Sequence, residues 1–160
     1  MPKSINITFK VAETPQEFEE GRSLFEQYAL FIGIDLSFQN FADELNTIDK
    51  QYNKPEGTLL IAYDESKAVG CVALRKWDSE TAELKRMFVM QEYQGHKIGQ
   101  RLLQQILDIA QELKYKKVRL DTLSTMKPAL TLYRLYGFYE IPAYRFNPME
   151  GTVYMEKILE

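Results

Sequence analysis

The feature that most constrains the fold is a strand that runs into a glycine-containing turn and then directly into an amphipathic helix. This segment is Val89-Met90-Gln91-Glu92-Tyr93-Gln94-Gly95-His96-Lys97-Ile98-Gly99-Gln100-Arg101-Leu102-Leu103. Glycine lets a backbone curl closely around a ligand, and the unpaired N–H groups at a helix start attract anions. The segment therefore predicts a strand–turn–helix cradle whose natural occupant is a diphosphate.

Two common phosphate-binding motifs do not fit this segment. A P-loop requires G-x-x-x-x-G-K-[ST], but Gly95 is followed by Gly99 without the Lys-Ser/Thr pair. A dinucleotide-binding fingerprint requires G-x-G-x-x-G after the first strand of a βαβ unit, and the glycine spacing differs. The diphosphate must belong to another kind of ligand.

Four segments together resemble the GCN5-related N-acetyltransferase (GNAT) family. They correspond to its fourth strand, its Q/R-x-x-G-x-G/A coenzyme A loop, its fifth strand and its A-x-x-L-Y-x-x-x-G-F helix, and they are residues 83–89, 94–99, 118–123 and 129–138. Lys97 stands where the family usually has its first glycine. The order and spacing of the segments agree, so the chain is identified as a member of the family from residue 81 to residue 139.

The resemblance implies an α/β (α+β) fold with a mixed, mostly antiparallel seven-stranded sheet. That sheet splays between strands 4 and 5 and is flanked by about four helices. Hydrophobic periodicity gives the element order β-α-α-β-β-β-α-β-α-β-β. Strands are expected at residues 5–11, 58–63, 68–75, 81–89 and 118–123, with two more near Tyr139 and Val153.

Capping signals mark the expected helices. Thr14 and Glu17, on either side of Pro15, form a capping box at the start of the first helix. A second helix is expected from Phe38 to Ile48, behind a Ser37 cap. Further helices are expected around residues 102–113 and 127–136. Lys114 follows the third helix where glycine is usual, and a left-handed conformation there costs about 1 kcal/mol.

Composition limits the class of protein. The chain has 160 residues, 45% of them hydrophobic, which indicates a single domain over residues 1–160. A net charge of −3 argues against nucleic acid as a partner. The single cysteine, Cys71, suits a reducing compartment. Neither a signal peptide nor a membrane-spanning run is evident, so we expect a cytoplasmic protein that has no membrane partner; a homodimer is left open.

Two residues are candidates for catalysis. Transfer of an acetyl group from a thioester to an amine needs a neutral amine, a stabilised oxyanion and a protonated leaving thiolate. The resemblance gives Glu83 the position of the general base, with an ordinary solvent-facing carboxylate as the alternative. Lys85 shares its strand face and would lower the Glu83 pKa. Tyr133 matches the general acid, with a core aromatic as the alternative.

The resemblance also implies how acetyl-CoA, the expected cosubstrate, would bind. The Met87 backbone would donate to the thioester oxygen. The residues expected to contact the cofactor are Met87, Phe88, Val89, Gln94, Gly95, His96, Lys97, Ile98, Gly99 and Gln100. Lys97 either adds charge near the diphosphate or is a solvated loop lysine, and Met126 replaces a frequent asparagine. His96 has no cysteine or carboxylate cluster beside it, so no metal is expected.

The acceptor is less well determined by the sequence. The acceptor pocket is expected to use Tyr28, Phe31, Tyr144 and Arg145. Arg145 either holds a substrate carboxylate or is an ordinary surface arginine. The leading hypothesis is an N-acetyltransferase acting on the primary amine of a small molecule through a tetrahedral intermediate. The alternatives are a protein acetyltransferase, acting on lysine or an N-terminal amine, and a noncatalytic acyl-CoA-binding regulator.

Overall fold

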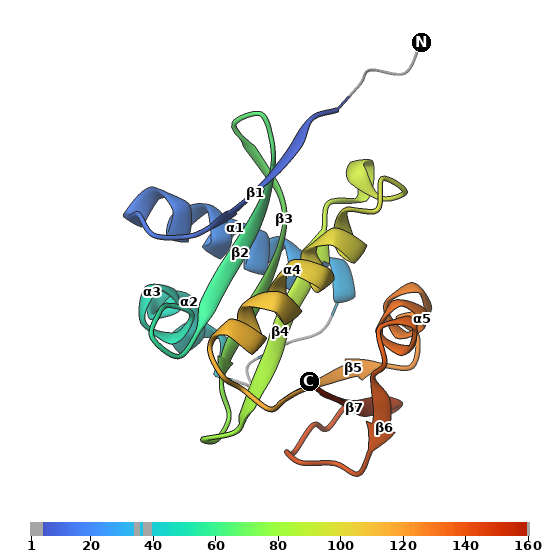
Figure 1. Ribbon diagram of the computed structural model, residues 1–160. Coiled ribbons are helices and arrows are strands. Elements are labelled where there is room, and N and C mark those ends of the chain that lie inside the picture. Colours follow the sequence, from blue (N-terminus) through green and yellow to red (C-terminus); the bar gives the residue numbers. More distant parts are fainter. Residues whose placement is uncertain (1–4, 34–35, 37–39, 160) are drawn as a thin grey trace.

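Seven strands form a single sheet in the order β1-β2-β3-β4-β5-β7-β6 in the computed structural model, which describes residues 5–33, 36 and 40–159 (Figure 1). All neighbouring strands are antiparallel except β4 and β5. The strands are β1 (Ile7–Val11), β2 (Thr58–Asp64), β3 (Lys67–Lys76), β4 (Thr81–Val89), β5 (Lys117–Leu123), β6 (Tyr139–Ile141) and β7 (Thr152–Ile158). The predicted mixed, mostly antiparallel sheet is confirmed.

The helices largely follow the capping signals. They are α1 (Pro15–Ile32), α2 (Phe41–Asn46), α3 (Ile48–Gln51), α4 (Ile98–Glu112) and α5 (Lys127–Leu135). The predicted capping box is present: Thr14 Oγ1 accepts from the Glu17 amide at 3.1 Å, and Glu17 Oε1 accepts from the Thr14 amide at 3.0 Å. Lys114 has the expected left-handed conformation, with φ of 73°. None of the helices in the described ranges is long and apolar enough to span a membrane.

The prediction of one continuous second helix is wrong. The chain leaves the helical conformation at Thr47, which has φ of −123°, so the segment divides into α2 and α3. The Thr47 hydroxyl donates to the Asp43 carbonyl at 2.7 Å. Threonine competes in this way for backbone groups that a continuous helix would use. The expected Ser37 cap and Phe38 lie outside the described residues.

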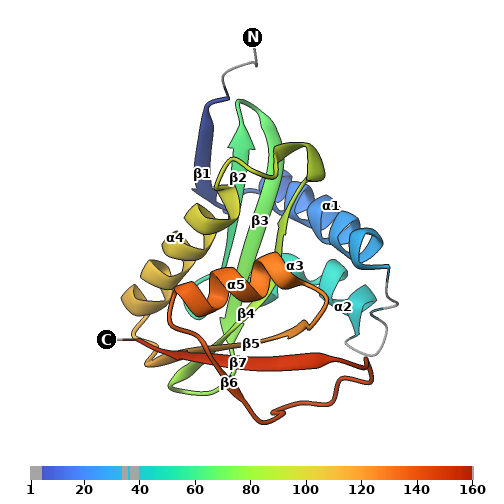
Figure 2. The same ribbon diagram turned by 90° about the vertical axis from the view of Figure 1, so that its right-hand side faces the viewer.

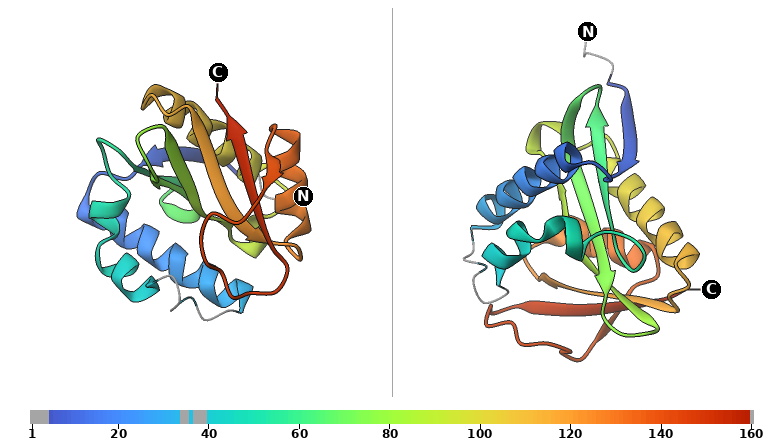
Figure 3. Two further views of the ribbon diagram at one scale, coloured as in Figure 1. Left: turned by 90° about the horizontal axis from the view of Figure 1, so that it is seen from below. Right: turned by 90° about the vertical axis from the view of Figure 1, so that its left-hand side faces the viewer.

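Two hydrophobic clusters cover opposite faces of the sheet. On β2, Leu60 and Ala62 join the cluster under α4 and α5, whereas Leu59 and Ile61 join the cluster under α1 and α3. This alternation is the period of two expected for a strand buried on both faces. Figures 2 and 3 show α4 and α5 on one face and α1 to α3 on the other. Each fully buried apolar side chain contributes roughly 1.5–3 kcal/mol.

The parallel pair β4–β5 separates soon after it begins. Only three residue pairs join the strands, the last being Glu83 with Arg119. Beyond this point β4 continues to Val89 and β5 to Leu123 without pairing to each other. The two strands diverge, with α5 lying across the divergence (Figure 2). The predicted splay between strands 4 and 5 is therefore present and leaves space for a site.

Candidate active site

A cavity of about 590 Å³ lies where β4 and β5 have separated, between the starts of α4 and α5. All the residues predicted to contact the cofactor line it except His96 and Gln100, which are exposed: the lining members are Met87, Phe88, Val89, Gln94, Gly95, Lys97, Ile98 and Gly99. Met126, Pro128 and Leu132 form the wall on the α5 side. The strand–turn–helix segment thus forms one continuous wall of one cavity.

The turn before α4 has the geometry of an anion cradle. Gly95 and Lys97 both have positive φ, at 90° and 60°. Lys97 is the residue that precedes α4, and its side chain makes no capping hydrogen bond. The first N–H groups of α4 therefore lack a side-chain cap from Lys97, and the helix dipole places its positive end there. An anionic group fits such an end.

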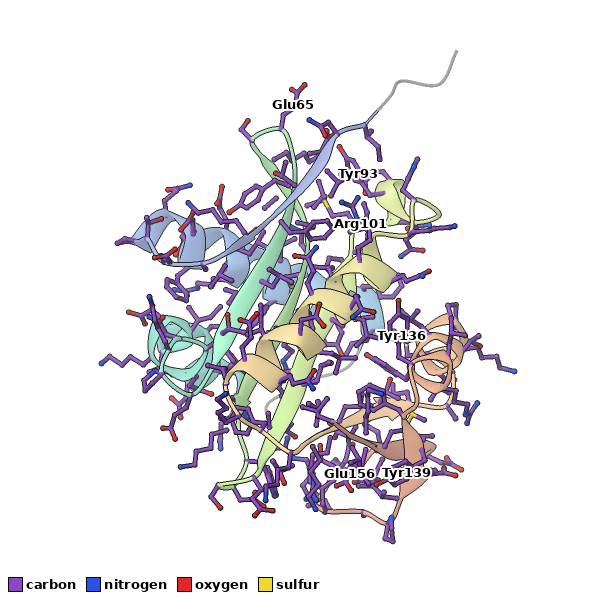
Figure 4. The ribbon with its side chains drawn as sticks, in the orientation of Figure 1. Glu65, Tyr93, Arg101, Tyr136, Tyr139 and Glu156 are labelled. Atoms are coloured by element: carbon purple, nitrogen blue, oxygen red, sulfur yellow. The ribbon has the colours of Figure 1, made fainter. Side chains whose placement is uncertain are left out.

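Two side chains tie this cradle to the sheet. The Tyr93 hydroxyl donates to Asp64 Oδ2 at 2.7 Å, at the end of β2. The Arg101 guanidinium lies 4.6 Å from the ring centroid of Phe9 on β1. Figure 4 shows Tyr93 and Arg101 near the turn and the first part of α4. These two contacts hold the cradle against strands β1 and β2.

A bulge in β4 turns its backbone at the level of the cavity. Cys71 of β3 pairs with Phe88, but Ala73 pairs with Lys85, so β4 carries an extra residue between these pairs. Arg86 has φ of 57°, and its carbonyl accepts a hydrogen bond from Cys71 Sγ at 3.3 Å. Bulges re-aim a strand locally and are frequent beside active sites.

A second, smaller cavity of about 60 Å³ adjoins the first. The two cavities share Tyr28, Met87, Met126 and Ala129, so they adjoin one another at Met87, in the bulged part of β4. The charged residues that line the smaller cavity are Lys85, Arg86 and Asp121. We call it the polar chamber because these charged groups line it beside apolar side chains such as Leu84 and Leu120, whereas the larger cavity is mainly apolar along the strand and α5.

Tyr133 lines the smaller cavity from α5 and is only 5% exposed. Its ring packs against Phe138, with 5.5 Å between ring centroids. Burial raises the pKa of Tyr133, and Tyr28 and Asp121 raise it further. An ordinary tyrosine is already protonated at neutral pH, so the raised pKa leaves the phenol protonated but makes it a weaker acid.

Glu83 lies in a closed ion-pair cluster rather than at the cavity wall. Its carboxylate accepts from Arg75 Nε at 3.0 Å, from the Tyr144 hydroxyl at 2.8 Å and from Arg145 Nη1 at 2.7 Å. It is fully buried and does not line either cavity, so the solvent-facing alternative is wrong. Burial favours the neutral acid, but the charges of Lys85, Arg75 and Arg145 outweigh it and lower the Glu83 pKa.

The four residues predicted for the acceptor separate into two pairs. Tyr144 and Arg145 are bound to Glu83 and do not line either cavity. Tyr28 and Phe31 line the larger cavity, where their rings lie 6.3 and 5.9 Å from the Phe88 ring. Tyr28 also lines the smaller one. Of these four, Tyr28 alone reaches the polar chamber.

Several charged residues of the site were not predicted from the sequence to line a cavity, although Lys85 was expected to lower the Glu83 pKa. Arg86 forms a buried pair with Glu44, donating from Nε at 3.0 Å and from Nη2 at 2.7 Å. Lys85 is also buried, and burial together with the charge of Arg86 lowers its pKa to about 7. The available signal was that charged residues follow one another within a central strand, where burial demands partners. Asp121 gave no comparable signal.

These features define a class: an open mixed sheet whose diverging fourth and fifth strands hold an anion cradle, an apolar cavity and a polar chamber. Among the described residues, no group of three histidine, cysteine, aspartate or glutamate side chains is placed to hold a metal ion. The chain matches the Acetyltransferase (GNAT) family over residues 21–138. It belongs to this family and is an N-acetyltransferase of the GNAT type.

Individual relatives agree with this assignment. The chain is 37% identical to an uncharacterized N-acetyltransferase of Schizosaccharomyces pombe over 97% of this chain and 96% of that one. An acetyltransferase of the GNAT family from Staphylococcus aureus has a similar structure, with a TM-score of 0.80, 23% identity and 97% and 100% of the two chains covered. A PaiA N-acetyltransferase from Thermoplasma acidophilum, in complex with coenzyme A, gives a TM-score of 0.74 at 18% identity, again covering 97% and 100%. The latter two share the fold.

Proposed function

We propose that the protein transfers an acetyl group from acetyl-CoA to the primary amine of a small molecule. The observation that carries this proposal is the arrangement of the two cavities. A cavity of about 590 Å³ runs from the anion cradle to Met87, and a polar chamber of about 60 Å³ adjoins it there. A chamber of this size suits a compact amine better than a folded polypeptide segment.

The larger cavity fits the chemistry of coenzyme A. The uncapped start of α4 and the positive φ at Gly95 and Lys97 suit a diphosphate, while the apolar wall of Val89 and Leu132 suits an uncharged arm. The relative from Thermoplasma acidophilum was crystallised with coenzyme A on the same fold. Lys97 takes the glycine-like conformation itself, so it does not deform the cradle.

In this proposal each residue acts where the thioester meets the amine. The backbone around Met87, turned by the bulge, donates to the carbonyl oxygen as negative charge develops there. Tyr133 gives its proton to the leaving thiolate, because a buried protonated phenol stands at the chamber. Glu83 as the general base remains a prediction, and it requires the carboxylate first to release Tyr144 or Arg145.

The test is a binding measurement followed by an acceptor panel. We expect titration calorimetry to give micromolar affinity for acetyl-CoA and thiol release to show turnover with compact primary amines. Peptides with an internal lysine should react poorly, because the chamber is small. Turnover that rises with peptide length would instead favour a protein acetyltransferase. Binding without turnover of any amine would favour a regulator.

A further inference from the structure

Asp121 is a carboxylate that the sequence did not single out. It lies just beyond the last residue pair that joins β4 and β5. It follows Arg119, the last residue of β5 that pairs with β4, by two positions and therefore lies on the same face of the sheet as Arg119. It lines the polar chamber together with Tyr28 and Tyr133. Its charge contributes, after burial, to the raised pKa values of both tyrosines. The Asp121 carboxylate thus acts on both aromatic walls of the chamber.

The partners of Asp121 leave it available to a cation. Asn147 Nδ2 donates to Asp121 Oδ2 at 3.1 Å, and the orientation of that amide is fixed because the Met149 amide donates to Asn147 Oδ1 at 2.9 Å. Within the described part of the chain, no ion pair involves Asp121, and Asn147 is its hydrogen-bond donor. Asp121 is therefore held in place by a neutral amide, without a direct ion pair to a described residue.

We propose that Asp121, in place of the Glu83 carboxylate that Arg75 and Arg145 hold, binds the ammonium group of the acceptor and accepts its proton, an inference that rests on the proposed acetyl transfer. One proton passes from the ammonium to the carboxylate, and the freed nitrogen lone pair forms the C–N bond as the carbonyl π electrons move to oxygen. Collapse re-forms the carbonyl and breaks the C–S bond. Tyr133 gives its proton to the departing thiolate, the acylated nitrogen loses its second proton to the resulting tyrosinate, and Asp121 returns its proton to solvent.

The same chamber holds two further basic groups. Lys85 and Arg86 also line it; Arg86 is paired to Glu44, and burial together with Arg86 lowers the Lys85 pKa to about 7. The acceptor class therefore follows from Asp121 and from the size of the chamber: it is a compact primary amine that arrives as an ammonium ion.

The experiment compares Asp121→Asn with the wild-type enzyme on two acceptors at saturating acetyl-CoA. One acceptor is an alkyl amine, which is an ammonium ion at neutral pH, and the other is an aryl amine, which is already neutral. We expect kcat/KM for the alkyl amine to fall by about 100-fold or more. For the aryl amine it should fall much less, because it brings no ammonium group. Asp121→Glu should recover part of the alkyl-amine activity.

Asp108→Asn is the matched control, since Asp108 is exposed on α4 and, among the residues that the structure describes, accepts from Gln104 alone. It should leave both rates unchanged. The acetyl-CoA affinity of Asp121→Asn, measured by calorimetry, should equal that of the wild type, which shows that the variant is folded. Equal losses for both acceptors, or a loss below twofold for the alkyl amine, would overturn the role of Asp121 while acetyl transfer stands. A wild-type enzyme that acetylates neither acceptor class would overturn both proposals.

Discussion

The β4–β5 pair has a joined end, where the two strands are paired, and a splayed end, where they separate. The two ends differ in which groups hydrogen-bond to their carboxylates. At the joined end, Glu83 is fully buried and accepts from two guanidinium groups and a phenol. At the splayed end, Asp121 accepts from one neutral amide and lines a cavity. Both lie on the same face of one sheet. A carboxylate whose charge is fully compensated contributes to the structure, and one whose charge is not compensated can bind a ligand.

The largest effect is expected at a compensated pair close to the splayed end. In Glu44→Gln, Arg86 loses the carboxylate that holds it, and both side chains are no more than 4% exposed. We expect the free energy of unfolding to fall by about 4 kcal/mol. Urea unfolding monitored by circular dichroism measures it. Glu44→Gln combined with Arg86→Met should recover much of the loss; a single variant that loses less than about 1 kcal/mol would contradict the pairing.

Replacing Glu83 and Asp121 one at a time by the corresponding amide tests whether the two ends differ in stability. Glu83→Gln should cost about 3 kcal/mol, somewhat less than Glu44→Gln because Arg75 and Arg145 are 25% and 18% exposed. Asp121→Asn should cost less than about 1 kcal/mol, since the amide still accepts from Asn147. The same urea experiment decides the order. Equal losses would mean that the two ends do not differ in compensation.

Tyr133 tests the chemistry at the splayed end. Tyr133→Phe removes a buried hydroxyl without changing the ring, so kcat should fall roughly 100-fold because the thiolate lacks its proton donor. The KM for acetyl-CoA should change little. Tyr136→Phe, also on the α5 segment and labelled in Figure 4, is the control and should retain full turnover. Full turnover by Tyr133→Phe would remove the role of general acid.

The ion pairs of Glu83 at the joined end should also affect how stability depends on pH. The Glu83 pKa is lowered in the folded protein, against an unfolded value of about 4.3. A lowered pKa contributes stability that is present above the unfolded pKa and is lost as pH falls through the folded pKa. The deficit of Glu83→Gln relative to wild type should therefore be constant near neutral pH and shrink below about pH 4. A deficit that grows in acid would contradict this sign.

The fold could be predicted from the sequence because its signals are local. The capping box at Thr14, the alternation along residues 58–63 and the glycine-containing turn each depend on a few neighbouring residues. The division of the second helix at Thr47 was missed, since a hydroxyl that bonds back to the Asp43 carbonyl has no signature in hydrophobic spacing. The family resemblance then supplied the splay that no local pattern contains.

The site was less predictable because charge compensation is set by distant residues. Arg145 lies 62 positions after Glu83, and Glu44 lies 42 positions before Arg86. The motif position of Glu83 predicts a function for it, but the side chains that hydrogen-bond to its carboxylate come from β3 and from the loop before β7. Asp121 lies in the segment 118–123 that resembles the fifth strand, but that resemblance gave it no role. Only the packed structure shows which carboxylate is compensated.

The smallest change in stability is expected from glycine substitutions at the two ends of α4. Lys97 and Lys114 both have left-handed backbones, with φ of 60° and 73°, but only Lys97 lines the larger cavity. Glycine relieves that strain of about 1 kcal/mol and adds disorder to the unfolded chain, so each Lys→Gly variant should gain less than about 1 kcal/mol. Lys97→Gly alone should weaken acetyl-CoA binding a few-fold by calorimetry, because a cation near the diphosphate is lost. Equal affinities in the two variants would show that Lys97 supplies only its conformation, and the cradle would then act through its N–H groups and helix dipole.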